Sequence, residues 1–392
     1  MQMHDDIVYL DHFASFLKRC HFSKDFAATA ADTATIIGQY PLLQHIAIAI
    51  GALDASRKGS TRAFGKLGSA QQTAFRAYGR SIQDLHTAIS TAGPVFRKDL
   101  FWSTFFHGLF EVCFDSGYIL YGLLISPQLL AENTGNSFVN HMVYGTSKML
   151  FMLKPTIPFP LATKSLIDAF WILEINRAIL YGDIAILPDN PQRLHMPRGK
   201  SILLARLIND TKNHRLFDTI EGVPEELRSF DPTLDALALE GLEIKERLLT
   251  WQRECHSETS ETLPVDSFTQ LSVTVHRALL LYHCNNFTFY SCWMTRLIPR
   301  LNRSEVNQHV SEILDLSERL LSDTHIPAVL LLFPLRMAGV HVSGFHGQEK
   351  VLGAVRKIRQ QGFVVSDTIE ADLKEFWQYR LGQPIEMNEV QL

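Results

Sequence analysis

This sequence of 392 residues has few cysteines, almost no strand-like alternation and no excess of positive charge, and each shortage excludes something. Its five cysteines are widely scattered and form no C-x-x-C pair. A disulfide framework and a zinc site built from neighbouring residues are therefore both excluded, and we expect no metal centre. A reducing intracellular compartment is the simpler inference.

Charge is nearly balanced, because 37 Lys and Arg oppose 41 Asp and Glu and the formal net charge is −4. This balance indicates no basic field of the kind that binds nucleic acid directly. The N-terminus is acidic, and no apolar run approaches the roughly 18 residues of a membrane span. We expect a soluble protein with no membrane anchor and no direct contact with nucleic acid.

Sequence motifs for cofactors and nucleophiles are also missing. The P-loop, G-x-G-x-x-G, G-x-S-x-G and H-E-x-x-H patterns do not occur, so we expect no cofactor. Histidine, by contrast, is abundant at 16 residues, many of them beside aromatic residues. This is a minor hint of acid–base chemistry or of pH-sensitive ligand binding.

Apolar residues at helical spacing are what the sequence has in abundance. One such stripe consists of Ile7, Leu10, Phe13, Leu17 and Cys20, and comparable stripes recur along the chain. The pattern predicts an all-α fold, a single large multi-helix array without a fixed repeat. We assign residues 1–381 to one helical domain and residues 382–392 to a flexible tail.

One helix near the C-terminus is predicted to be the centre of this array. From Ala328 to Val340 the chain is apolar apart from Arg336, as in a helix that is buried on most sides. Pro334 lies inside this run and predicts a kink. Farther along, Gly362 has the place of a C-terminal helix cap and Ser366 that of the next N-cap.

Several stretches together resemble a known family. They are Tyr40-Pro-Leu-Leu-Gln-His-Ile-Ala-Ile-Ala-Ile-Gly-Ala52, Ala77-Tyr-Gly-Arg-Ser-Ile-Gln-Asp-Leu85, His141-Met-Val-Tyr-Gly-Thr-Ser-Lys148, Leu332-Phe-Pro-Leu-Arg-Met-Ala-Gly339 and Gly362-Phe-Val-Val365. In their order and spacing they resemble the regulatory domain of fungal transcription factors of the zinc binuclear cluster class. The resemblance covers about Asp6 to Trp377 and implies an all-helical regulatory domain of a nuclear protein, often one that governs metabolic or secondary-metabolite genes.

Members of this family usually carry six closely spaced cysteines near the N-terminus, which hold two zinc ions beside a DNA-reading helix. This sequence begins at Met1 directly inside the regulatory domain and has nothing comparable. We therefore expect a protein that lacks its own DNA-binding module and regulates through partners. Two alternatives stay open: the sequence is a trimmed piece, or the helical scaffold has been put to another use.

His107 and Glu111 are the first candidates for chemistry, because residues at i and i+4 share one helix face. That spacing suits an acid–base pair or two metal ligands, and the surrounding phenylalanines would make such a site dry and shift the pKa of both groups. No other residue at zinc-ligand spacing accompanies them. The plainer interpretation is a half-buried histidine bonded to a neighbour.

His141 and Tyr144 are the second candidates, one helical turn apart and followed by Lys148. They could line a polar strip, although support of the fold is the alternative at positions that the family resemblance covers. A catalytic role for these two residues, or for His107 and Glu111, applies only if the protein is an enzyme.

Further residues are candidates for binding a small ligand. Arg177 either pairs with Glu174 on the same helix or binds a carboxylate through its guanidinium fork. Arg336 needs a partner inside its buried helix, either a carboxylate from another helix or a ligand anion. His341 lies in a predicted turn, where it would border a cavity or simply stabilise the turn.

Two functions from different classes fit these patterns. The first is a transcription-factor-like regulatory protein that controls or serves a fungal secondary-metabolite pathway, located in the nucleus or otherwise in the cytoplasm. It would bind a small-molecule metabolite or protein partners such as a DNA-binding regulator. The second is a cofactor-independent biosynthetic enzyme, a lyase, cyclase or isomerase, with histidine acid–base catalysis in an interior pocket. A purely structural adaptor is a third possibility.

Overall fold

The computed structural model confirms the all-α fold. It describes residues 2–20, 37–58, 67–91, 97–113, 232–258, 267–285 and 301–382, together with isolated positions at 35, 167, 170, 180, 204, 207–208 and 210–211. Every regular element within these residues is an α-helix or a 3₁₀ turn. The assignment of residues 1–381 to one domain stays a prediction, and residues 383–392 of the predicted tail lie outside the described part.

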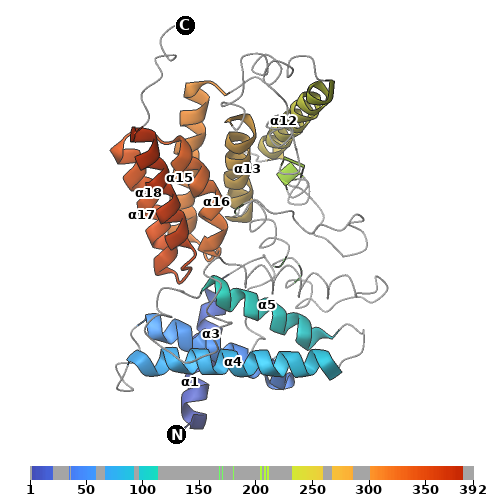
Figure 1. Cartoon of the computed structure of the whole chain (residues 1–392), viewed down its shortest axis with the longest axis vertical. Helices are drawn as coiled ribbons and strands as arrows, with labels where there is room; N and C mark the ends of the chain where they lie inside the picture. Colours follow the sequence, from blue (N-terminus) through green and yellow to red (C-terminus); the bar gives the residue numbers. More distant parts are fainter. Residues whose placement is uncertain are drawn as a thin grey trace.

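The first group of helices comes from the N-terminal part of the chain. It consists of α1 (Gln2–Lys18), the 3₁₀ turn η1 (Pro41–Leu43), α3 (Gln44–Arg57), α4 (Leu67–Thr91) and α5 (Lys98–Val112). Helix α3 is its centre, because it packs against α1, α4 and α5 (Figure 1). Pro41 is the first residue of η1. Proline is tolerated at this position because the first N–H groups of a helix have no partner within the helix.

Helix α3 is buried on every side because its residues are apolar and small. Each residue from Ile46 to Ala55 is buried, and half of these ten residues are alanine or glycine. The small side chains let α1 approach closely. A Cβ atom added to Gly51 would lie 1.8 Å from the carbonyl oxygen of Tyr9, so only glycine fits at that crossing.

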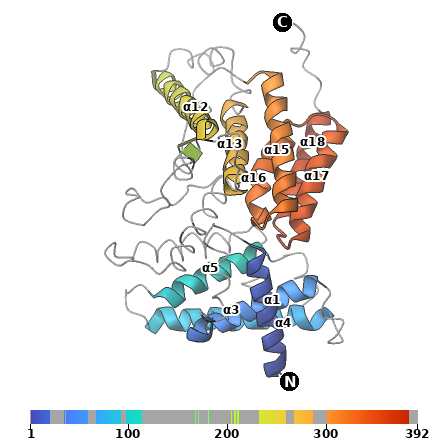
Figure 2. The same cartoon turned by 180° about the vertical axis from the view of Figure 1, so that it is seen from behind.

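The second group comes from the C-terminal part of the chain. Its elements are α12 (Pro232–Glu258), α13 (Ser267–Asn285), α15 (Arg303–Asp323), η8 (Ala328–Leu331), α16 (Leu332–His341), α17 (Phe345–Gln360) and α18 (Ser366–Gly382). Helix α16 is surrounded by α13, α15, α17 and α18, as both views show (Figures 1 and 2). This confirms the predicted buried helix near the C-terminus.

The predicted kink at Pro334 takes the form of a change of helix type. The 3₁₀ turn η8 leads directly into α16, and Pro334 is the third residue of that α-helix. The first four N–H groups of an α-helix have no partner within the helix, so the missing N–H of this proline costs nothing there. The helical path therefore changes at Leu331 and Leu332, just before the proline.

The turn between α17 and α18 confirms one predicted cap and corrects the other. Gly362 has φ = +105°, and the Phe363 amide donates to the carbonyl of Ile358 at 3.3 Å, as expected of a glycine C-terminal cap. Ser366 is buried, and its hydroxyl donates to the carbonyl of Phe363 at 2.7 Å. The predicted N-cap role of Ser366 is therefore wrong, because its hydroxyl closes the preceding turn instead.

Helix α12 extends as far as Glu258 and packs against α13. Two histidines of α13 fix its register against α12. His276 Nε2 donates to the carbonyl of Leu248 at 2.8 Å, and His283 Nε2 donates to that of Gly241 at 2.8 Å. His276 and His283 are seven positions apart on α13, and Gly241 and Leu248 are seven positions apart on α12. The two bonds therefore lie about two helical turns apart. None of the described helices is long and apolar enough to cross a bilayer.

Replacement of Gly51 tests the close packing of α1 on α3. We expect Gly51→Ala to lower the free energy of unfolding by about 3 kcal/mol or more, because the new methyl group meets backbone rather than a flexible side chain. Urea unfolding followed by circular dichroism measures this loss. Gly79→Ala in α4 is the matched control: nothing lies within 4 Å of its added Cβ, so it should be neutral or stabilise by up to about 1 kcal/mol. Equal effects of the two substitutions would contradict the packing.

Candidate functional site

The structure describes the side chains of only some of the predicted site residues. Those placed with their surroundings are His107, Arg336 and His341. Outside the described residues lie His141, Tyr144 and Arg177. Glu111 is described by its backbone alone, in the last turn of α5. The catalytic pair His107–Glu111 and the pair His141–Tyr144 therefore stay predictions.

His107 is fully buried between α5 and α4. Its Nδ1 lies 2.7 Å from the carbonyl oxygen of Ser103, which fixes the proton on that nitrogen. Its Nε2 lies 2.9 Å from the hydroxyl oxygen of Ser81, and the ring leans against Tyr78. Both ring nitrogens face groups of the protein interior, which is the environment of a histidine that stabilises the fold.

Arg336 lies on α16 with its guanidinium reaching away from the core. Its Nη1 donates to the carbonyl oxygen of Leu180 at 2.8 Å, and its Nη2 lies 3.5 Å from the carboxylate of Asp372 on α18. Asp372 is thus the carboxylate from another helix that the sequence analysis expected. Both side chains are more than a third exposed, so this ion pair contributes little to stability.

His341 ends α16 beside Arg380 of α18. Its burial, followed by the charge of Arg380, lowers the pKa of His341 from 6.5 to about 4. A helix C-terminus would favour a protonated histidine, but that effect amounts to less than about 1 kcal/mol. Arg380 takes the place of that cation by donating to the carbonyl of Val340 at 3.1 Å. His341 is accordingly neutral at pH 7.

The described candidates do not form one site. His107 belongs to α5 in the N-terminal group, whereas Arg336 and His341 belong to α16. On α16 these two residues are five positions apart, which separates them by about 140° around the helix axis. Their partners differ accordingly, Asp372 for one and Arg380 for the other. A ligand-binding role of Arg336 and His341 stays a prediction.

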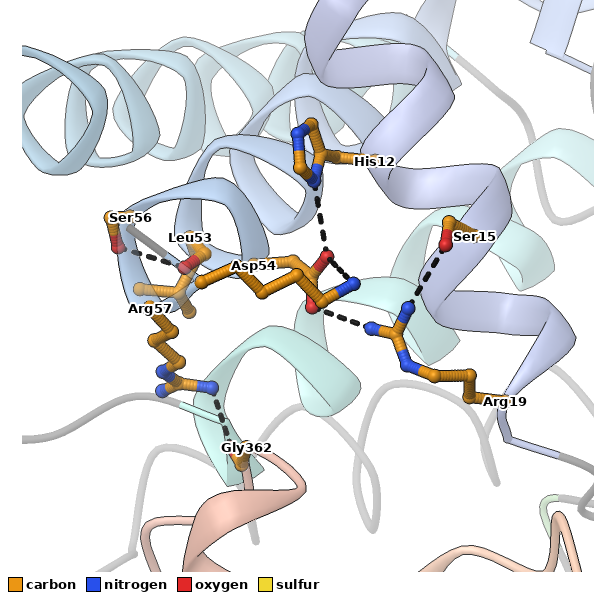
Figure 3. A network of polar contacts seen from close by, with 9 residues as sticks. His12, Ser15, Arg19, Leu53, Asp54, Ser56, Arg57 and Gly362 are labelled. Carbon is orange, nitrogen blue, oxygen red and sulfur yellow. Dashed lines mark hydrogen bonds and ion pairs between the residues drawn. The ribbon is translucent and has the colours of Figure 1, made fainter. Parts of the chain in front are cut away.

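A polar network that the sequence analysis did not find lies around Asp54 (Figure 3). The carboxylate of Asp54 is buried near the end of α3 and is surrounded by nitrogen atoms of two cations and one histidine. Arg19 Nη2 donates to it at 2.6 Å, Lys58 Nζ lies 2.9 Å away, and His12 Nδ1 lies 3.3 Å away. This carboxylate joins α1 to the C-terminal end of α3.

Arg57, also in Figure 3, extends the polar contacts of α3 toward the second helix group. Its Nη1 donates to the carbonyl oxygen of Gly362, the cap residue after α17, at 2.5 Å. Its guanidinium also hydrogen-bonds the thiol of Cys113. Burial raises the pKa of Cys113 to about 11 although Arg57 opposes this, so Cys113 is a neutral thiol and not a reactive one.

Part of this network had a signal in the sequence. Asp54 is the single acidic residue in the apolar run of α3, and a buried carboxylate requires a partner. The identity of the partners had no such signal, because His12 and Arg19 come from another helix 42 and 35 residues away. Within the described residues no group of three or more His, Cys, Asp or Glu side chains is placed to hold a metal ion. The Asp54 network joins α1 to α3 and so positions these two helices.

Removing the Asp54 charge tests the network. We expect Asp54→Asn to lower the free energy of unfolding by about 1–3 kcal/mol, because the cations around it lose their counter-charge while the side-chain volume is kept. This loss is smaller than for a fully buried pair because Arg19 and Lys58 are over a third exposed. Asp84→Asn is the control, since its pair with His45 is half exposed, and it should cost less than about 1 kcal/mol. Urea unfolding would contradict the network if both variants lost the same stability.

The pKa of His341 predicts a pH dependence of stability. Its folded-state pKa of about 4 lies below the ordinary 6.5, so the unfolded chain binds more protons between these values. The stability that neutral His341 provides is complete above pH 6.5 and is lost as the pH falls toward 4, by at most about 3 kcal/mol. His341→Gln should flatten the measured stability between pH 6.5 and 4 relative to the parent chain. The same substitution at the exposed His86 should leave the profile unchanged.

Comparison with known proteins shows to which family the chain belongs. The family profile described as fungal specific transcription factor domain matches residues 9–388, which is nearly the whole chain and includes both helix groups. No curated protein and no solved structure matches the chain significantly. The family match confirms the resemblance that the sequence stretches indicated. The chain belongs to the fungal-specific transcription factor domain family.

Proposed function

We propose that this protein is a transcription regulator that binds a protein partner or a small metabolite. In this proposal DNA is contacted by a protein partner and not by the chain itself. The observation that carries the proposal is the family match over residues 9–388. The match covers nearly the whole helical array, which supports a regulatory role for that array. The place of action that the family implies is the nucleus.

The composition of the chain supports an indirect mode of action. The zinc binuclear cluster needs six closely spaced cysteines, whereas the five cysteines of this sequence are scattered from Cys20 to Cys292. The balanced charge, with a net value of −4, provides no strong attraction to the phosphate backbone. A DNA-binding regulator is therefore the kind of partner that we propose.

The geometry of the described candidates also favours regulation over catalysis. His107 is bonded to Ser103 and Ser81 inside the fold, and Arg336 and His341 face different partners. The family match lends the enzyme alternative no support. The target that we propose is a fungal secondary-metabolite pathway, because the family often governs such genes.

A deletion strain tests the proposal when transcripts and metabolites are measured in the same culture. We expect transcripts of a gene set, including genes that neighbour the deleted one, to fall several-fold and the end product to decline without an accumulating intermediate. A reintroduced parent copy should restore both. Unchanged transcripts together with an accumulating intermediate would instead show a missing enzymatic step and overturn the proposal.

A tethering experiment tests regulation independently of the native target genes. The full chain is fused to an unrelated DNA-binding domain and placed upstream of a reporter gene. If the chain recruits a regulatory partner, reporter output should change several-fold relative to the DNA-binding domain alone. An unchanged reporter, with the fusion present at equal level in the nucleus, would count against a regulatory partner.

A further inference from the structure

The described helices pack mainly within their own group, α3 with α1, α4 and α5, and α16 with α13, α15, α17 and α18. Contact between the two groups is nevertheless clear at one place, the turn that joins α17 to α18. There Arg57 of α3 binds the carbonyl of Gly362, and the ring of Phe16 from α1 lies 6.5 Å from that of Phe363. One turn of the second group is thus held by two helices of the first.

The carbonyl of Gly362 is well suited to accept a bond from a cation. It follows the C-terminal end of α17, where the helix dipole concentrates partial negative charge on the last carbonyls. Gly362 is held at φ = +105°, which side-chain-bearing residues rarely adopt. A Cβ atom at this position would also lie 3.0 Å from Arg57 Nη1, so the glycine leaves room for the guanidinium.

Within its own group, the guanidinium of Arg57 is compensated by the thiol of Cys113 and by the charge of Asp54. Burial lowers the pKa of Arg57, and the nearby charge of Arg359 on α17 lowers it further. Asp54 opposes this effect, but its carboxylate already contacts the cations of α1 and α3. The Gly362 carbonyl adds a bond from the other group, in which Arg359 is itself paired with Asp367 at 2.8 Å.

We propose that Arg57 is a clasp: it docks the α17–α18 turn onto α1 and α3, and its release lets the two helix groups reorient as units. The described helices that contact one another extensively all lie within one group, so this turn is the contact on which the docked state rests. Packed interfaces change between discrete arrangements rather than deforming continuously. An event at one helix group thus reaches the other through this turn. The clasp does not depend on the proposed regulatory function.

Hydrogen exchange of the full chain tests the clasp. In Arg57→Ala, the amides of the turn, from Gly362 to Asp367, should exchange at least about tenfold faster than in the parent chain, because each opening of the contact is no longer opposed. Amides in the middle of α4 should keep their rates. Arg97→Ala is the matched control, since Arg97 pairs with Asp99 inside the N-terminal group, and it should leave the turn unchanged.

Arg57→Lys separates the clasp from general packing. Lysine keeps the charge but has a single donor group, so turn exchange should fall between the parent and Arg57→Ala. A clasp requires this order of rates and requires the acceleration to stay within the turn and the ends of α1 and α3. Equal acceleration across all helices, or an unchanged turn in Arg57→Ala, would overturn the proposal.

The parent chain provides a second measurement should Arg57→Ala fail to fold. At low urea concentration, the turn amides and the amide of Lys58, which bonds the Asp54 carbonyl at the end of α3, should open together at a lower free energy than global unfolding. Small-angle X-ray scattering under the same conditions should show an increased radius of gyration. If the turn opens only with global unfolding, the two groups form one unit and the clasp is wrong.

Discussion

Burial of α3 on every side is the constraint on which the rest of this structure depends. A helix whose residues Ile46–Ala55 are all buried can carry a charge only where its neighbours supply compensation. Asp54 meets this condition through cations of α1 and of its own helix end, and Arg57 meets it through the carbonyl after α17. The charges of α3 thereby decide how α1 and the α17–α18 turn are placed.

The second helix group repeats this design around α16. The buried residues of α16 are again apolar, and the one arginine of this helix, Arg336, reaches outward to Asp372. The neighbouring helix α18 comes close enough for the indole of Trp377 to donate to the carbonyl of Gly339 at 2.8 Å. Each of the two central helices is enclosed by helices of its own group, and the family profile extends over both groups.

Patterns of a single period were readable from the sequence, and contacts between distant residues were not. The stripe Val351, Leu352, Val355 and Ile358 is buried as helical spacing predicts, and Gly362 caps α17 as expected. Ile7 shared the stripe of Phe13 and Leu17 but is 54% exposed, because α1 extends beyond the helices that cover it. The Asp54 network brings together residues up to 42 positions apart, and no local rule predicts which cation meets which carboxylate.

The N-terminal helix group depends on the second group for one hydrogen bond of Arg57. Separated from the second group, it would expose or strand the guanidinium of Arg57, since the Gly362 carbonyl belongs to a turn 305 residues later in the chain. A bond that spans such a distance in sequence forms only when both groups have folded, so it contributes to their association and not to the formation of either. The C-terminal end of α3 is therefore bonded directly to the cap residue of α17, and a long-range link of this kind is what a regulatory domain needs from its scaffold.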